Sequence, residues 1–174
     1  MRILIALTGD EIDHDIAATV AQMFDAERDR VMAVHVAHPR EARATYERVE
    51  STDTAARGAD LSAMSSDRPP TGPAEGAEQA IERLGSEFAD HLKMISHQRL
   101  AGFTVEHDLV ISDDPAEAIV EAVTRYSIDA ITMGTRSKRS RLTSALLGSA
   151  AEKVIRDVSV PVTVVKEGTV AASD

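Results

Sequence analysis

The 174-residue sequence predicts an α/β fold: a doubly wound, five-stranded parallel sheet of strand order 3-2-1-4-5 with helices on both faces, in a Rossmann-like arrangement. Two observations carry this prediction. Short, nearly unbroken apolar runs alternate with segments whose apolar residues recur at helical spacing. The apolar runs end at turn-forming residues, as strands covered on both faces do. The length suits one domain, expected over residues 1–167, with a short tail at 168–174.

The first elements follow directly from the apolar pattern. Ile3–Leu7 is a continuous apolar run and predicts a buried strand. Apolar residues at helical spacing predict a helix over 12–24, with Asp10 or Asp13 available to cap its start. Residues 31–36 form the second apolar run. The order strand, helix, strand is typical of a parallel sheet.

A long segment after the second strand has a different composition. Residues 40–75 contain few large apolar side chains and many Pro, Gly, Ser and Asp, which predicts a flexible insertion with some helix near 41–49. Apolar residues from Ala77 to Ile95 then form one stripe of a long amphipathic helix, with Pro73 suited to its first turn. Gly102 is expected to end it.

The third strand and the helix after it carry the clearest local signals. Residues 103–111 alternate and then become continuously apolar, which predicts a strand. Asp114 provides an N-cap, Pro115 suits the first helical position, and Glu117 places an acid at the third. A helix is therefore expected to start here.

The last elements surround a glycine-containing loop. Ala130–Met133 predicts a fourth strand closed by Gly134, and Ser149–Glu152 reads as a capping box that opens a helix. Val160–Val165 predicts a fifth strand, in which Pro161 favours an edge position or a strand start. We expect every strand to be buried.

Composition and charge exclude several classes of function. There is no cysteine, so disulfides, thiolate zinc sites and a cysteine nucleophile are excluded. The formal net charge of −10 argues against nucleic acid or an anionic membrane as the principal partner. The apolar N-terminal run is too short for a signal sequence or a membrane span, so we expect a cytoplasmic protein.

Ligands of doubly wound sheets bind at the carboxyl ends of the strands, near the point where the strand order reverses. Gly134 there would allow a sharp turn, and Gly148 with Ser149 would present backbone N–H groups at a helix N-terminus. Residues 136–141 contain four basic side chains, including Arg136, which either stabilise a phosphate chain or form a solvated loop. The sequence thus predicts an anion site.

Together these segments resemble the universal stress protein family, whose nucleotide-binding members carry Gly, two residues, Gly, nine residues, Gly and then Ser or Thr. The resemblance implies the adenine nucleotide alpha hydrolase-like variety of the fold, a role in stress adaptation, AMP or ATP as ligand with Mg²⁺ as an optional companion, and a homodimer. It rests on Arg2–Ala6, Val34–Val36, Asp113–Glu117, Met133–Arg136, Leu146–Val154 and Val160–Val162.

The resemblance also implies a set of site residues. The base would meet the backbone near Val36, the ribose Thr8 and Gly134, and the phosphates Arg136 and the start of the last helix. Three features differ from the family pattern: Thr8 replaces an acid, Ser137 replaces the second loop glycine, and ten residues separate Ser137 from Gly148. The expected nucleotide-binding residues are Thr8, Val36, Met133, Gly134, Arg136, Ser137, Gly148, Ser149 and Ala150.

We expect no catalytic residue and no metal ligand. The six histidines, His91 among them, lack metal-ligand spacing and are interpreted as surface or half-buried structural residues. Asp113 and Asp114 are explained by a helix start, and no hydrolase, P-loop or dinucleotide motif occurs.

Three functions remain open. The first is a nucleotide-responsive binding module with an unidentified protein client. The second is a ligand-free dimeric interaction protein with a degenerate site, and the third is a slow ATPase. Dimerisation is expected through the apolar edge of the fifth strand, because such an edge is an open pairing template. Its expected contact residues are Val160, Val162 and Val164.

Overall fold

The structure is a computed structural model that describes residues 1–41, 73–135 and 148–168, with side chains described from residue 77 onward in the second range. The expected helix near 41–49 and the insertion core at 50–72 lie outside the described residues apart from Glu41. Arg136 and Ser137 also lie outside them. Among the described residues, no helix is long and apolar enough to cross a membrane.

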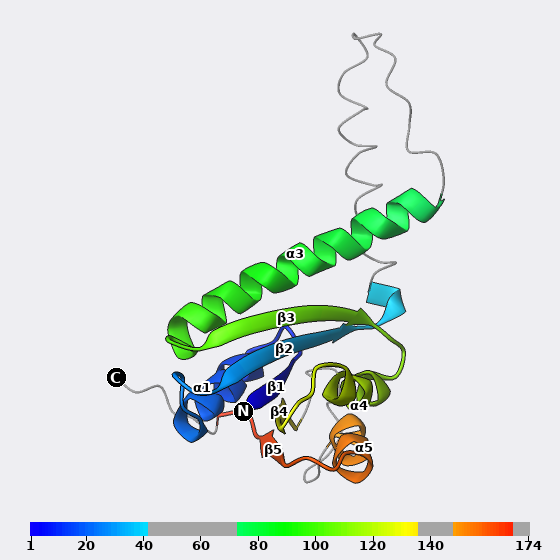
Figure 1. The fold of residues 1–174 in the computed structure, drawn as a ribbon. Helices are drawn as coiled ribbons and strands as arrows, with labels where there is room; N and C mark the ends of the chain where they lie inside the picture. Colours follow the sequence, from blue (N-terminus) through cyan, green and yellow to red (C-terminus); the bar gives the residue numbers. More distant parts are fainter. Residues whose placement is uncertain (42–72, 136–147, 169–174) are drawn as a thin grey trace.

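The sheet confirms the predicted topology. All strand pairs are parallel and the order is β3-β2-β1-β4-β5. The chain builds the sheet outward from β1 to β3 in one direction and then continues from β4 to β5 in the other, so the strand order reverses between β1 and β4 (Figure 1). The strands are β1 (Arg2–Leu7), β2 (Arg30–Ala37), β3 (Thr104–Ile111), β4 (Ala130–Gly134) and β5 (Val162–Val165).

Helices cover both faces of the sheet, as predicted, with two of the described helices on each. Alternate side chains of β1 explain why: Ile3 and Ile5 pack into one buried cluster, whereas Leu4 packs into the other. The first cluster includes residues of α1 (Ile12–Met23) and α3 (Pro73–Arg99). The second includes residues of α4 (Pro115–Arg125) and α5 (Ser149–Asp157).

The edge strands differ from the expectation that every strand is buried. This expectation was wrong for β3, in which Thr104, Glu106 and His107 are exposed and the other residues are half-buried. An edge strand has a neighbour on one side only, so its side chains are covered less completely. At the other edge, Pro161 directly precedes β5 and its carbonyl oxygen accepts from the Ile131 N–H at 2.9 Å. The prediction for Pro161 is thus confirmed.

One predicted helix start is confirmed and another is wrong. The Asp114 side chain caps α4 by accepting from the Glu117 N–H at 3.0 Å. In α5, by contrast, Gly148 is the N-cap and Ser149 is already the first helical residue, so Ser149 is no cap. The helix therefore begins one residue before the predicted position. The hydrogen bond from the Gly148 N–H to the Thr135 carbonyl oxygen, at 2.9 Å, holds Gly148 in place as the N-cap.

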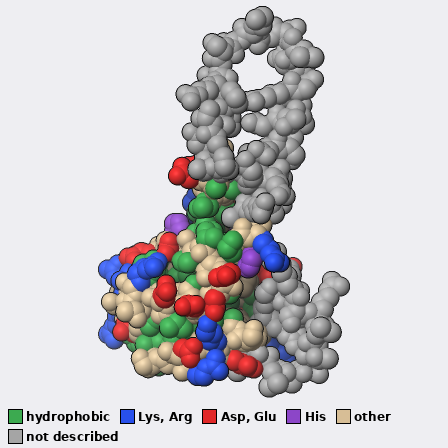
Figure 2. Space-filling model, turned by 90° about the vertical axis from the view of Figure 1, so that its right-hand side faces the viewer, with side chains coloured by type: hydrophobic (Ala, Val, Ile, Leu, Met, Phe, Trp, Pro, Cys, Tyr) green, Lys and Arg blue, Asp and Glu red, His purple; other side chains and the backbone are tan. Residues whose placement is uncertain are grey.

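The surface of the described chain mixes both charges. Figure 2 shows acidic and basic side chains interspersed over the described part of one face, with a group of apolar side chains at the upper end of the coloured part. Both signs of charge therefore occur on this face, although the chain as a whole carries a formal net charge of −10.

Candidate functional site

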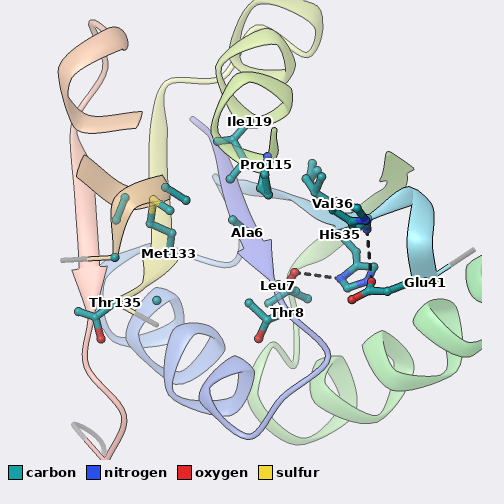
Figure 3. A pocket seen from close by; sticks show the side chains of 16 residues that line it. Ala6, Leu7, Thr8, His35, Val36, Glu41, Pro115, Ile119, Met133 and Thr135 are labelled. Atoms are coloured by element: carbon teal, nitrogen blue, oxygen red, sulfur yellow. Dashed lines mark hydrogen bonds between the residues drawn. The ribbon is translucent and has the colours of Figure 1, made fainter. Parts of the chain in front are cut away.

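A cavity of about 320 Å³ lies at the carboxyl edge of the sheet, where the strand order reverses. It opens there because the connections after β1 and β4 leave on opposite faces of the sheet. Figure 3 shows Pro115 and Ile119 of α4 on one side, Met133 on another, and His35 with Val36 of β2 opposite. The lining is largely apolar, with a few polar groups at the rim, as in many small-molecule sites.

The structure brings most of the expected nucleotide-binding residues together. Ser149 instead lines a neighbouring shallow cavity with Asp114 and Lys153, which shares Pro115 and Ala150 with the first. Arg136 and Ser137 lie outside the described residues. The expected residues that line the cavity are Thr8, Val36, Met133, Gly134, Gly148 and Ala150.

Both cavity glycines have close neighbours, but of different kinds. A Cβ at Gly148 would lie 2.8 Å from the Thr135 carbonyl oxygen, a backbone atom that cannot move aside easily. A Cβ at Gly134 would lie 2.7 Å from Cδ1 of Ile12, the flexible end of an α1 side chain. Neither glycine has a positive φ. Gly134 therefore makes room for α1, and Gly148 lets α5 begin directly against the chain that leaves β4.

Two helices begin at the cavity, and their N-termini differ. The N-cap of α5 is Gly148, and no side-chain hydrogen bond caps this helix among the described residues. Helix N-termini carry partial positive charge and amide N–H groups without intrahelical partners. Ala150, in the first turn of α5, lines the cavity. We call this the open helix start; it suits an anion.

The start of α4 is occupied by its own acid. The Asp114 carboxylate accepts from Nζ of Lys153 at 2.5 Å and from the Glu117 N–H. The hydrogen bond from Lys153 is the largest cause that lowers the pKa of Asp114 below 3.8. The same bond raises the pKa of Lys153 above 10.5. The charge of Lys153 is thus committed to α4, which leaves the open helix start as the anion-attracting end.

The rim at β1 depends on a residue whose role was missed from the sequence. The Asp13 side chain is fully buried and does not cap α1. Its Oδ1 accepts from the Thr8 N–H at 2.9 Å and the Thr8 hydroxyl at 3.2 Å, and its Oδ2 accepts from the Gly9 N–H at 2.8 Å. Nε2 of His91 lies 3.0 Å from Oδ2. His91 is 78 positions from Asp13, so no local pattern indicated this contact.

A second histidine also belongs to the rim. His35 lines the cavity, and its Nδ1 lies 3.0 Å from the Leu7 carbonyl oxygen. Because a carbonyl oxygen only accepts, Nδ1 of His35 carries a hydrogen and donates it to Leu7. The ring stacks on Phe88 of α3, with centroids 5.2 Å apart. His35 thus offers a fixed aromatic wall beside Val36.

Comparison with known proteins identifies the family. The family model described as universal stress protein family matches residues 1–166. The chain belongs to the universal stress protein family. It is 38% identical over 96 residues to universal stress protein MJ0531 of Methanocaldococcus jannaschii, covering 55% of this chain and 56% of that protein. It is 33% identical over 86 residues to the Bacillus subtilis stress response protein NhaX, covering 49% and 48%. The chain spans about half the length of these two curated relatives.

Several solved structures share the fold. The hypothetical protein MJ0577 superposes with a TM-score of 0.66 at 23% identity, with 97% of each chain covered. Universal stress protein UspA of Lactobacillus plantarum gives 0.63 at 14% identity, with 95% of this chain and 97% of that one covered. An Arabidopsis thaliana family protein with AMP bound gives 0.51 at 13% identity, with 97% and 93% covered.

Proposed function

We propose that this universal stress protein binds an adenine nucleotide, AMP or ATP, in the cavity at the carboxyl edge of its sheet. One observation carries the proposal: the 320 Å³ cavity is bounded at one end by apolar walls and at the other by the open helix start. Such a cavity accommodates a ligand with an apolar flat part and an anionic part. A nucleotide has both.

The placement of the ligand follows from the walls. Val36, Ile119 and Met133 suit the flat face of the base, and the sugar would lie near Gly134. The phosphate would meet the first amides of α5, at Ser149 and Ala150. The Thr8 hydroxyl already donates its hydrogen to Asp13, so Thr8 offers a ligand only a methyl group and an acceptor oxygen.

Related structures support the chemical class. The Arabidopsis thaliana family protein was solved with AMP bound, and another universal stress protein was solved in complex with cAMP. The two ligands, AMP and cAMP, share the adenine base, the ribose and a phosphate. We infer the same class of ligand for this chain, with Mg²⁺ as an optional companion of ATP.

The regulatory role is part of the same proposal. The nucleotide-bound state would be read by a protein client or by a second copy of the chain. Within the part of the chain that the structure describes, β5 is an edge strand that pairs with β4 alone, and such an edge is a template for a second β5. Val162 and Val164 on this strand are half-buried within the single chain.

A ligand-free dimeric interaction protein is the alternative. The observation that favours it is the commitment of the Thr8 hydroxyl to Asp13, at the position where nucleotide-binding relatives are expected to place an acid. In that case the cavity would be a remnant, and the dimer would carry the function.

Calorimetric titration of the whole chain with AMP and ATP, each with and without Mg²⁺, decides between them. We expect saturable binding of one nucleotide per chain. Ala150→Glu should weaken it by tenfold or more, because Ala150 lines the cavity and an acid there would face the phosphate, whereas Glu152 in the same turn does not line the cavity. Ala150→Gln has the same size without the charge and is the matched control. If neither nucleotide binds to the wild type, the nucleotide proposal is rejected in favour of the ligand-free dimer.

The dimer has its own test. Val162→Asp with Val164→Asp places charges along the β5 edge and should yield monomers in analytical ultracentrifugation. His107→Asp, on the exposed edge strand β3, should leave the oligomeric state unchanged. A dimer that survives the β5 changes while the variant remains folded would refute this interface.

A further inference from the structure

The Asp13 carboxylate joins segments from three parts of the chain. Asp13 lies in the first turn of α1, Thr8 and Gly9 form the turn after β1, and His91 lies on α3. Helices α1 and α3 pack on the same face of the sheet (Figure 1). The Asp13 side chain is 0% exposed, so its hydrogen-bond partners among the described residues are all within the protein.

The geometry requires a carboxylate at this position. Backbone N–H groups can only donate, so both oxygens of Asp13 must act as acceptors, Oδ1 for Thr8 and Oδ2 for Gly9. An amide side chain could satisfy only one of these two. Gly9 adopts a positive φ of 79°, and the two hydrogen bonds hold this turn against α1. Asp13 therefore sets the position of Thr8 at the cavity rim.

The same carboxylate reaches α3 through His91. Oδ2 accepts from the Gly9 N–H and faces Nε2 of His91, whose side chain is 22% exposed. Phe88, about one turn earlier on α3, stacks on His35, and His35 contacts the Leu7 carbonyl. Helix α3 is thus connected to Leu7, the last residue of β1, through His35, and to Thr8, which follows the strand, through Asp13.

We propose that Asp13 and His91 are positioning residues that couple the docking of α3 to occupancy of the nucleotide cavity. The proposal rests on the proposed function, because it concerns the same site. A ligand that displaces Thr8 changes the hydrogen bonds at Asp13, and Oδ2 transmits that change to His91. Coupling of this kind is reciprocal: loosening α3 must weaken ligand binding by the factor by which the ligand tightens α3.

Amide hydrogen exchange of the nucleotide-free protein tests the physical link. His91→Leu removes the donor, His91→Gln keeps an N–H at the same reach, and His97→Leu is a control at an exposed position of the same helix. We expect His91→Leu to speed exchange at Thr8 and Gly9 on the order of tenfold, consistent with loss of one hydrogen bond to a charged group. His91→Gln should restore slow exchange. Unchanged exchange at both amides would overturn the proposal.

Addition of AMP tests the coupling. In the wild type and in His97→Leu, AMP should slow amide exchange along α3 near His91, and this protection should be lost in His91→Leu. AMP affinity should fall in His91→Leu and recover in His91→Gln. Equal protection in the wild type and His91→Leu would overturn the coupling while nucleotide binding stands. No AMP binding by the wild type would remove both the proposed site and its coupling.

Discussion

The two helices that begin at the cavity carry similar sequence signals but have different N-termini. The start of α4 is closed by Asp114, whose carboxylate also pairs with Lys153. The start of α5 has a serine and an acid at capping-box spacing, yet its N-cap is Gly148. The difference teaches that a capping motif predicts a helix reliably but not the residue at which it begins. It also shows which of the two ends remains available to a ligand.

The largest expected effect comes from breaking the close approach that creates the open helix start. In Gly148→Val the new Cβ would lie 2.8 Å from the Thr135 carbonyl oxygen. We expect a loss of about 1–3 kcal/mol in the free energy of unfolding, as for overpacked cores, and loss of nucleotide binding. Urea denaturation and calorimetry measure the two.

A glycine elsewhere provides the control for Gly148→Val. Gly85 lies inside α3, and a Cβ there would meet only Cδ2 of Leu109 at 3.8 Å, an ordinary contact. Gly85→Ala should therefore raise stability by about 0.5–1 kcal/mol. Should Gly148→Val prove as harmless as Gly85→Ala, the close approach would not be what fixes the start of α5.

A smaller effect separates the two caps directly. Asp114→Ala removes the side chain that accepts from the Glu117 N–H and from Lys153, so it should destabilise the protein. Ser149→Ala removes a hydroxyl that caps nothing in α5 and should change stability by less than about 0.5 kcal/mol. Thermal denaturation of the two variants measures the order. If Ser149→Ala were the more damaging change, the capping box would be the better description.

The sequence predicted the topology because each strand and helix carries its own local pattern. Ile3–Leu7 is an apolar run and Ala130–Met133 is one interrupted only by Thr132, and both are long enough only for strands. Their burial on both faces is a consequence of their place inside the sheet. The start of α4 was predictable because Asp114, Pro115 and Glu117 act within one turn. These are short-range effects that a sequence displays directly.

The site was predicted less completely because its rim depends on contacts between distant segments. The start of α5 is set by the hydrogen bond from Gly148 to Thr135, which needs the loop to close. The role of Asp13 needs His91, and the orientation of His35 needs Phe88 of α3. No spacing rule relates these pairs. The burial of the Asp13 carboxylate and the contacts within the other two pairs are visible only in three dimensions.

The smallest expected effect concerns the charge at the closed helix start. Asp114→Asn keeps an oxygen that can cap α4 but removes the ion pair with Lys153. The pKa of Asp114 is lowered below 3.8 in the folded protein, chiefly by Lys153, so its charge stabilises the fold at pH values above 3.8. The stability difference between wild type and Asp114→Asn should be constant at neutral pH and shrink as the pH falls through 3.8 toward the lowered pKa.

Because the carboxylate is 38% exposed, solvent screens the pair, and the difference should also shrink in high salt. Urea denaturation of both proteins between neutral and acidic pH measures it. A difference that persists at the acid end would show that the asparagine disturbs the cap itself, and the closed start of α4 would then depend on shape rather than on charge.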